Sequence, residues 1–354
     1  PVTVTIEYSG VVYDSLEAPA IRWVRRGPGA RPVRTEPVPP GLEQPNPLGG
    51  RRRRLRGSRT RRPNRMTVPE LRVRSLNRAS QREDGDYGLY WLTGFRRLEW
   101  NFALERAVEH ANRLQRPLVI LEALRTGYRW ASDRLHRFVL EGMADHLEAA
   151  SSTRAVYLPF VERREDEGSG LLEAMAESAA LVVTDDYPAF FLPRMVRAAA
   201  GRVEVSMEAV DSNGLLPMRA ADRVFARAYD FRRWLQKNLA PHLQEMPAPS
   251  PLEDLEVDGR RSSRVRETLD RITERWRPAE LALFESLDEL LAALPIDHDV
   301  APIDERGGRR SGRAKLEGFL DERLDRYHEH RNDVVDGADS GLSPWLHFGH
   351  VSSH

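Results

Sequence analysis

Short apolar runs alternate with helical stretches between residues 87 and 207, and this alternation constrains the fold more than any other feature of the chain. The runs are almost continuously apolar, so both faces of each predicted strand must be covered by other parts of the protein. Strand–helix–strand units of this kind form parallel sheets through right-handed crossovers. The sequence therefore predicts an α/β fold with a doubly wound parallel sheet, Rossmann-like in architecture. The predicted strands are 87–93, 117–124, 155–161, 180–184 and 202–207. The predicted helices between them are 95–116, 133–150, 171–179 and 188–200, with Asp133 as a cap.

Polar residues follow several of these strands, where ligands of doubly wound sheets bind. The candidates are Thr93, Gly94, Arg125, Thr126, Gly127, Thr184, Asp185 and Asp186. Neither a GxGxxG nor a GxxxxGK[ST] motif follows the first strand, so a dinucleotide fingerprint or a P-loop has no support. The two aspartates could hold Mg²⁺, but without a phosphate-binding loop they are better interpreted as strand-end turn residues. No metal site is expected.

The second half of the chain has a helical pattern. Helices are predicted at 220–239, 263–276 and 279–294, with a proline-rich break at 247–255 that suits a connector. A further amphipathic helix at 314–329 carries an apolar stripe. Its stripe consists of Leu316, Phe319, Leu320, Leu324 and Tyr327. We therefore expect an α/β domain at 67–210, a helical connector at 211–313 and an all-α segment at 314–354.

Residues 1–66 have no comparable pattern. Residues 1–65 contain 14 arginines and 5 acidic residues, whereas the remaining chain carries a net charge of −9. A basic arm that contacts phosphates is one interpretation, but a disordered or non-native segment fits the proline and glycine content better. The chain has no cysteine, no apolar run near 18 residues and no visible signal peptide, which fits a cytoplasmic protein.

The most specific motif lies near the C-terminal end, where Ser340, Gly341, Leu342 and Ser343 precede Pro344. Serine hydroxyls followed by proline mark the start of a helix, whose free N–H groups attract anions. Glycine at position 341 allows the backbone to approach a phosphate closely. Taken alone, this pattern indicates only a helix cap.

The residues around this cap carry a family resemblance. The helix with Tyr327 and Arg331, followed by S-G-L-S-P-W-L-H-F-G, resembles the entrance to the FAD-binding domain of photolyases and cryptochromes. The stretch GDYGLYWLTGFRRLEWNFALERAVEHAN resembles the first strand and helix of the family's antenna domain, especially in class II photolyases. The resemblance extends over about residues 68–354, with a weaker middle part.

The resemblance implies a deoxyribodipyrimidine photolyase-like flavoprotein that splits cyclobutane pyrimidine dimers in UV-damaged DNA by light-driven electron transfer from reduced FAD. It implies that Tyr327, Arg331, Ser340, Gly341, Leu342 and Ser343 contact the cofactor, and that an antenna chromophore, a deazaflavin or a folate, binds elsewhere. Two alternatives remain open, a cryptochrome-like photoreceptor without repair and an inactive truncated fragment. Catalytic residues cannot be named, and a monomer without membrane contact is expected.

Several features depart from the family pattern or stay ambiguous. Asp339 stands where the family often has threonine, and Arg331 could supply a cation between this carboxylate and a diphosphate. His347, His350 and His354 could share one helix face, but packing or flavin contact is favoured over metal binding. Since the family's adenine pocket lies beyond His354, the 354-residue chain is expected to bind FAD weakly or not at all. Trp91, Trp100 and Trp130 could contact an antenna chromophore, with core packing favoured for the first two.

Overall fold

The computed structural model describes residues 68–333, 335 and 337–354. The predictions for residues 1–66 therefore lie outside the described residues. Within the described part, no helix has both the length and the apolar character needed to span a membrane. The described residues divide into two units, one formed by 68–222 with 236–354 and the other by 223–235.

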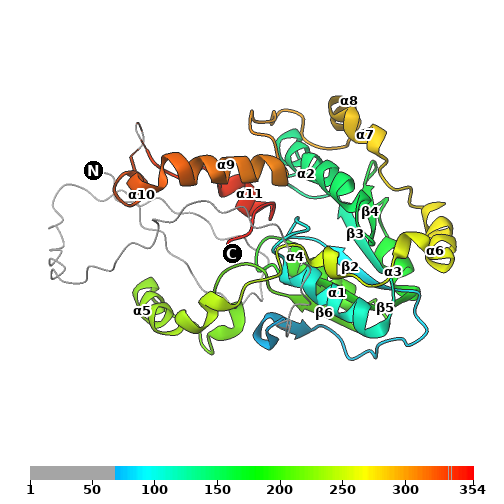
Figure 1. Ribbon diagram of the computed structural model, residues 1–354. Helices are drawn as coiled ribbons and strands as arrows, with labels where there is room; N and C mark the ends of the chain where they lie inside the picture. Colours follow the sequence, from blue (N-terminus) through cyan, green and yellow to red (C-terminus); the bar gives the residue numbers. More distant parts are fainter. Residues whose placement is uncertain (1–67, 334, 336) are drawn as a thin grey trace, which may run out of the picture. The chain divides into compact units, whose positions relative to one another are not determined.

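A six-stranded sheet forms the centre of the first unit, in the order β1-β6-β5-β2-β3-β4 (Figure 1). All strand pairs are parallel except β1 with β6, which is antiparallel. The strands are β1 (Val73–Ser75), β2 (Tyr87–Leu92), β3 (Leu118–Leu124), β4 (Val156–Val161), β5 (Ala179–Asp185) and β6 (Met207–Val210). The crossovers are α1 (Phe102–Leu114), α2 (Asp133–Ser151), α3 (Leu171–Glu177) and α4 (Leu192–Ala200). The predicted mixed α/β fold with a mostly parallel Rossmann-like sheet is confirmed.

The central strands are buried as their composition requires. Every residue of β2 and β5 is buried, and so is all of β3 except one position. The main core lies around these strands and extends to α1, α3 and α6 (Ser263–Thr273). A smaller core joins α2 to α7 (Leu281–Glu285) and α8 (Leu287–Ala292). Burial on both faces explains why these strands lack the polar alternation of a half-exposed sheet.

Several predicted boundaries are wrong. The strand expected at 202–207 is instead β6, which begins at Met207, and the short edge strand β1 was not predicted. The helix expected from residue 95 begins after Asn101, whose side chain accepts hydrogen bonds from the N–H groups of Ala103 and Leu104. Ser132, not Asp133, occupies the N-cap position of α2.

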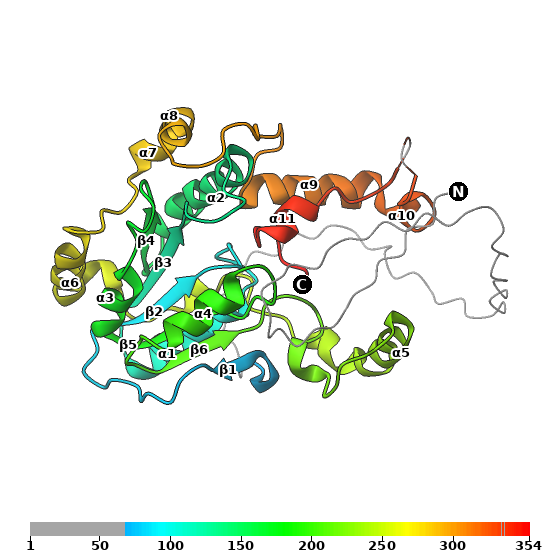
Figure 2. The ribbon, with the colours of Figure 1, turned by 180° about the vertical axis from the view of Figure 1, so that it is seen from behind.

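The C-terminal helices are shorter than predicted. The stretch expected at 314–329 forms α9 (Arg309–Glu322) and α10 (Leu324–His330), which are separated at Arg323. The stretch at 279–294 is likewise split into α7 and α8 at Ser286, and α5 covers only Ala228–Asn238. The last helix, α11 (Ser343–His347), lies beside α9, and Figure 2 shows the same neighbourhood from behind.

Candidate functional site

The sheet reverses its strand order between β2 and β5, where open sheets of this class usually bind ligands. Here the chain itself fills that position. The Asp185 carboxylate accepts hydrogen bonds from the backbone N–H groups of Thr93, Gly94 and Phe95, over 2.7–2.9 Å. A Cβ atom on Gly349 would lie 2.3 Å from the carbonyl oxygen of Gly94, so the C-terminal segment packs backbone against backbone on this loop.

The strand-end aspartates are therefore structural in this fold. Asp185 is fully buried and also accepts a 2.7 Å hydrogen bond from the Tyr90 hydroxyl. Asp186 forms ion pairs with Arg74 and Arg219 over 2.8 and 2.6 Å. Burial alone would raise the pKa of Asp186, but the hydrogen bonds and charges of Arg74 and Arg219 together hold it below its ordinary value. Among the described residues, no cluster of three or more His, Cys, Asp or Glu side chains is arranged to hold a metal ion.

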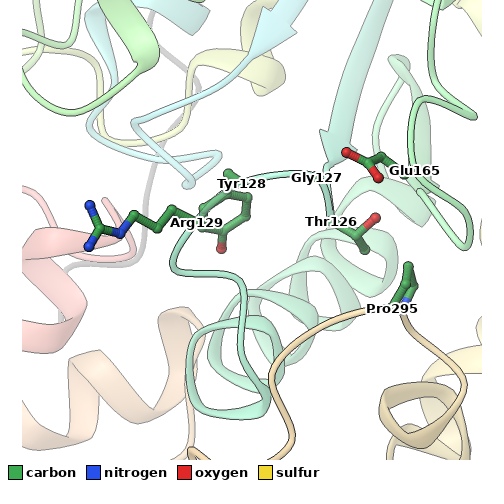
Figure 3. Close-up of a pocket in the computed structure, with 6 residues that line it drawn as sticks. All are labelled: Thr126, Gly127, Tyr128, Arg129, Glu165 and Pro295. Atoms are coloured by element: carbon green, nitrogen blue, oxygen red, sulfur yellow. The ribbon is translucent and has the colours of Figure 1, made fainter. Parts of the chain in front are cut away.

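An open pocket of about 340 Å³ lies instead beyond the ends of β3 and β4. Figure 3 shows that the loop after β3 provides most of its wall, with two other loops completing it. The pocket is lined by Thr126, Gly127, Tyr128, Arg129, Glu165 and Pro295. Sequence analysis identified Thr126 and Gly127 as strand-end candidates but did not identify the others.

Buried hydrogen bonds hold the walls of this pocket together. The carboxylate of Glu162, at the end of β4, accepts bonds from the N–H groups of Thr126 and Gly168 over 2.8 and 3.2 Å. The loop that carries Pro295 is fixed to the start of α2, because the Asp297 carbonyl accepts a bond from the Asp133 N–H over 3.1 Å. The pocket thus has a largely preformed frame.

One lining residue, Tyr128, belongs to a group of aromatic rings. The Tyr128 ring stacks on His136 at 5.7 Å and packs against Phe191 at 5.3 Å. Burial raises the pKa of the Tyr128 hydroxyl to about 12, so the phenol remains neutral. Phe190 is 62% exposed and has a φ of 60°, a strained conformation for an aromatic residue.

The tryptophans differ in environment. Trp91 is buried in the sheet core, as predicted. Trp100 is 37% exposed with a φ of 48°, so the preference for core packing was wrong at this position. Trp130 is 64% exposed and lies under the Arg129 guanidinium, 4.5 Å from the ring centroid.

The serine-bearing turn is the second candidate site, and the serines are not buried in apolar packing. Ser343 is exposed and Ser340 is half-buried, whereas Leu342 and Trp345 point into the structure, 7% and 2% exposed. Gly341 has a φ of 64°, a conformation that favours glycine. The turn thus presents hydroxyls outward and anchors itself through apolar residues inward.

Polar contacts within the turn come from its own side chains. The Asp339 carboxylate accepts a 3.0 Å bond from the Gly341 N–H, and the Ser340 hydroxyl accepts a 3.4 Å bond from the Leu342 N–H. Asp339 is therefore occupied as a turn-forming residue.

The cation beside this turn is Lys315 of α9. A Cβ atom on Gly341 would lie 2.7 Å from Cε and 3.3 Å from Nζ of Lys315, and the ammonium also lies 5.9 Å from the Trp345 ring. Arg331, proposed from sequence for this role, instead lies over the Tyr327 ring at 5.8 Å. Tyr327 is half-buried and packs edge-on against Phe319 at 5.4 Å. Sequence reasoning missed Lys315, although it is one of only two lysines in the chain.

The predicted histidine cluster is distributed over separate contacts. His350 is buried and stacks on Phe138, His347 packs edge-on against Phe190, and His354 packs edge-on against Phe102. Each ring thus has an aromatic neighbour of its own, and the interpretation as packing or flavin contact rather than metal binding stays a prediction.

Comparisons with known proteins agree with this architecture. No family model matches the chain. It is 29% identical over 282 residues to a deoxyribodipyrimidine photo-lyase of Methanothermobacter thermautotrophicus, covering 79% of this chain and 57% of that protein. It is 28% identical over 296 residues to a deoxyribodipyrimidine photo-lyase of Arabidopsis thaliana, covering 81% of this chain and 56% of that protein. The chain thus spans somewhat more than half the length of these curated relatives.

Among solved structures, a bacterial class III photolyase from Agrobacterium tumefaciens matches with a TM-score of 0.53 and 18% identity. That match covers 76% of this chain and 51% of that one. The fold is therefore that of the Rossmann-like N-terminal domain of photolyases. The two curated relatives and this solved structure all carry the name photolyase.

Proposed function

We propose that the chain is part of a photolyase that repairs cyclobutane pyrimidine dimers in UV-damaged DNA. The observation that carries this proposal is the similarity over 79% of the chain to a deoxyribodipyrimidine photo-lyase, with the exposed serine turn inside the matching fold. The curated relatives reported above carry the name photolyase, which favours repair over a photoreceptor without repair.

The residues around the serine turn fit an FAD diphosphate. Lys315 supplies a positive charge beside Gly341, where a larger side chain would collide with it. The Ser343 hydroxyl is exposed and free to donate to a phosphate oxygen, and Ser340 lies half-buried beside it. Asp339 remains compatible because its carboxylate accepts the Gly341 N–H within the turn. A bound, reduced FAD would supply the light-excited electron donor, while these residues hold and orient it.

A flavin titration tests the assignment of the turn. FAD is added to the purified chain and binding is followed by flavin fluorescence anisotropy. We expect weak, saturable binding that Ser343→Ala or Lys315→Gln reduces by about tenfold, because each substitution removes a hydrogen bond to a charged group. Arg313→Gln, on the same helix, is the control and should leave the affinity unchanged. Saturable binding that neither turn substitution changes would assign the flavin to another place.

A repair assay tests the activity itself. The chain, with saturating reduced FAD, is mixed with DNA containing a cyclobutane dimer and exposed to blue light. Light-dependent loss of the dimer supports repair. Flavin binding without any dimer reversal would favour the photoreceptor alternative or a chain that lacks essential parts.

We further propose that the pocket after β3 and β4 binds the antenna chromophore, a deazaflavin or a folate. The open pocket combines a preformed wall with the exposed aromatic rings that border it, which suits a planar ligand with polar substituents. Each pigment is titrated separately. Tyr128→Ala should weaken binding of the correct pigment by at least about fivefold through lost stacking. Binding of neither pigment would contradict this assignment.

A further inference from the structure

Two buried histidines lie where the C-terminal segment packs on the α/β fold, and within the described residues each leaves one ring nitrogen without a partner. Both His146, on α2, and His350, after α11, are 2% exposed. Within the described residues, the Nε2 atoms of both rings are buried and lack a hydrogen-bond partner. Buried polar atoms are nearly always paired, so two neighbouring exceptions need an explanation.

The partners of His350 determine where its proton lies. Its Nδ1 accepts a 2.9 Å hydrogen bond from the backbone N–H of Gly308, so this nitrogen carries no proton. The neutral ring must then carry its proton on Nε2. The ring stacks on Phe138 at 5.2 Å, and its Nε2 lies 2.5 Å from the place of a Cβ atom on Gly142. The unpaired donor of His350 therefore lies directly on α2.

The partners of His146 determine the opposite arrangement. Its Nδ1 lies 2.8 Å from Oε2 of Glu122, and a carboxylate can only accept, so Nδ1 carries the proton. In the neutral ring, Nε2 is then an unpaired acceptor. Burial alone would raise the pKa of Glu122, but His146 foremost, together with Arg96 and the Tyr157 hydroxyl, lowers it to about 2. Glu122 thus remains ionised and keeps His146 in this tautomer.

The two unpaired nitrogens are complementary, and their places on α2 bring their residues together. His146 follows Gly142 by four residues on α2, so both positions lie on one face of the helix. Helical side chains lean toward the N-terminus of their helix, so the His146 ring is directed toward Gly142. The His350 ring lies against Gly142. Burial, and after it the neighbouring His146, lowers the pKa of His350.

We propose that Nε2–H of His350 donates to one water molecule that in turn donates to Nε2 of His146, and that this bridge latches residues 345–351 onto the α/β fold only while both rings are neutral. The resulting chain of hydrogen bonds runs from Glu122 through His146 and His350 to the Gly308 N–H. Protonation of His146 turns its acceptor into a second donor. Protonation of His350 removes the acceptor of the Gly308 N–H. The latch does not depend on a bound flavin, but it holds the segment that directly follows the serine turn.

The charges around the latch are fixed by partners of their own. On α2, Glu141 accepts the Gly307 N–H over 2.6 Å and Asp145 pairs with Arg306 over 2.9 Å. Arg96, from the loop after β2, pairs with Glu122 over 2.7 Å. Tyr157, from β4, donates to Glu122 over 2.7 Å. Each of these neighbouring groups thus has a hydrogen-bond or ion-pair partner.

Burial, followed by the effect of His146, lowers the pKa of His350 well below its ordinary value of 6.5. A histidine whose pKa is lowered in the folded state favours the packed form at high pH. That contribution decreases as the pH falls below the unfolded value of 6.5. Acidification should therefore release the C-terminal segment.

Nitrogen-15 NMR spectra of the imidazoles in the full 354-residue chain test the tautomers directly. At about pH 7.5 we expect the proton on Nδ1 of His146 and on Nε2 of His350. The reverse tautomer in either ring would overturn the proposal, because the two Nε2 atoms would no longer be donor and acceptor.

Hydrogen exchange tests the latch. Between about pH 7.5 and pH 5, the protection factor of the Gly308 amide should fall by at least about tenfold. His350→Gln should abolish this pH dependence, and His146→Gln should reduce it, because glutamine does not titrate. His298→Gln is the matched control, because His298 is exposed and pairs with Asp133 at the start of the same helix. This substitution should leave the decrease in protection unchanged. Equal protection at both pH values, or an unchanged decrease in either latch variant, would refute the latch.

Discussion

The strand-end region of the α/β fold and the C-terminal helical region are stabilised in different ways. In the sheet, β2 and β5 are buried at every position, and β3 at all but one. In the C-terminal region, α9 buries only Gly312 and Phe319, and α10 buries no residue. Leu320, Leu324 and Leu346 are between 43% and 48% exposed there.

The difference shows how each candidate site is held. The pocket after β3 and β4 lies on a frame whose stability comes from extensive apolar burial. The serine turn depends on a few close contacts, above all the buried Trp345, the buried His350 and the backbone approach at Gly349. We expect substitutions in the first region to change global stability, and substitutions in the second to change local opening.

The largest effect is expected from Asp185→Ala. It leaves three backbone N–H groups and the Tyr90 hydroxyl without this acceptor in a buried position, which should cost about 3 kcal/mol or more of unfolding free energy. Urea unfolding followed by circular dichroism measures the loss. Asp186→Ala, the neighbouring control, removes partly exposed ion pairs and should cost less than about 1 kcal/mol. Equal losses would show that the loop is not held by Asp185.

A smaller and local effect is expected from Gly349→Ala. The residue has a φ of 73°, and a Cβ atom would collide with the Gly94 carbonyl, so the segment should lose about 1–3 kcal/mol of local stability. Faster hydrogen exchange at residues 345–351, with little change in global unfolding, is the expected result.

Gly318→Ala provides the control for this substitution. Apart from the adjacent residues and the backbone of α9 itself, no atom lies within 4 Å of its Cβ position, so this variant should be neutral or slightly stabilising. If Gly349→Ala lowered global stability as much as Asp185→Ala, the separation of the two regions would be wrong.

The smallest effect at neutral pH is expected from a substitution at Glu208. Its value is that the two regions should lose stability at different acidic pH values. Burial alone would raise the pKa of Glu208 on β6. The larger combined effect of His110 and Arg106 on α1 lowers this pKa to about 2. A carboxylate with a lowered pKa stabilises the fold above its unfolded value of 4.5, and that contribution is lost as the pH falls toward 2. Global unfolding should therefore respond mainly below pH 4.5, whereas the C-terminal segment should loosen below 6.5.

Glu208→Gln tests this separation. In this variant, the free energy of unfolding should fall less steeply as the pH is lowered. Hydrogen exchange of the Gly308 amide should stay unchanged. Thermal unfolding monitored across the acid range measures the first quantity. An unchanged slope below pH 4.5 would mean that Glu208 does not contribute to the acid response.

Apolar runs were sufficient to predict β2, β3, β4 and β5 to within about two residues, because strands buried on both faces have an unambiguous composition. They failed at β6. Val203 and Val205 are buried like strand residues, but their carbonyl oxygens accept hydrogen bonds from the Asn77 side chain in a loop. A side chain 126 residues away in sequence could not be anticipated from local pattern.

Some residues of the candidate sites could be predicted from the sequence and others could not, because the latter depend on contacts between distant parts of the chain. The exposed position of Ser343 follows from local turn chemistry, and the sequence indicates it. The cation could not be chosen from sequence, since Lys315 reaches Gly341 only through the packing of α9 beside α11. The aromatic border of the pocket was missed because Tyr128 and Phe191 come from different crossover loops.

Phosphorus-31 NMR tests most directly whether the serine turn receives a flavin diphosphate. The two phosphate resonances of FAD are followed as the purified chain is added. The account predicts that both resonances shift or broaden with the unmodified chain, and that Ser343→Ala combined with Lys315→Gln largely removes the change. Identical phosphate changes with the doubly substituted chain would contradict it.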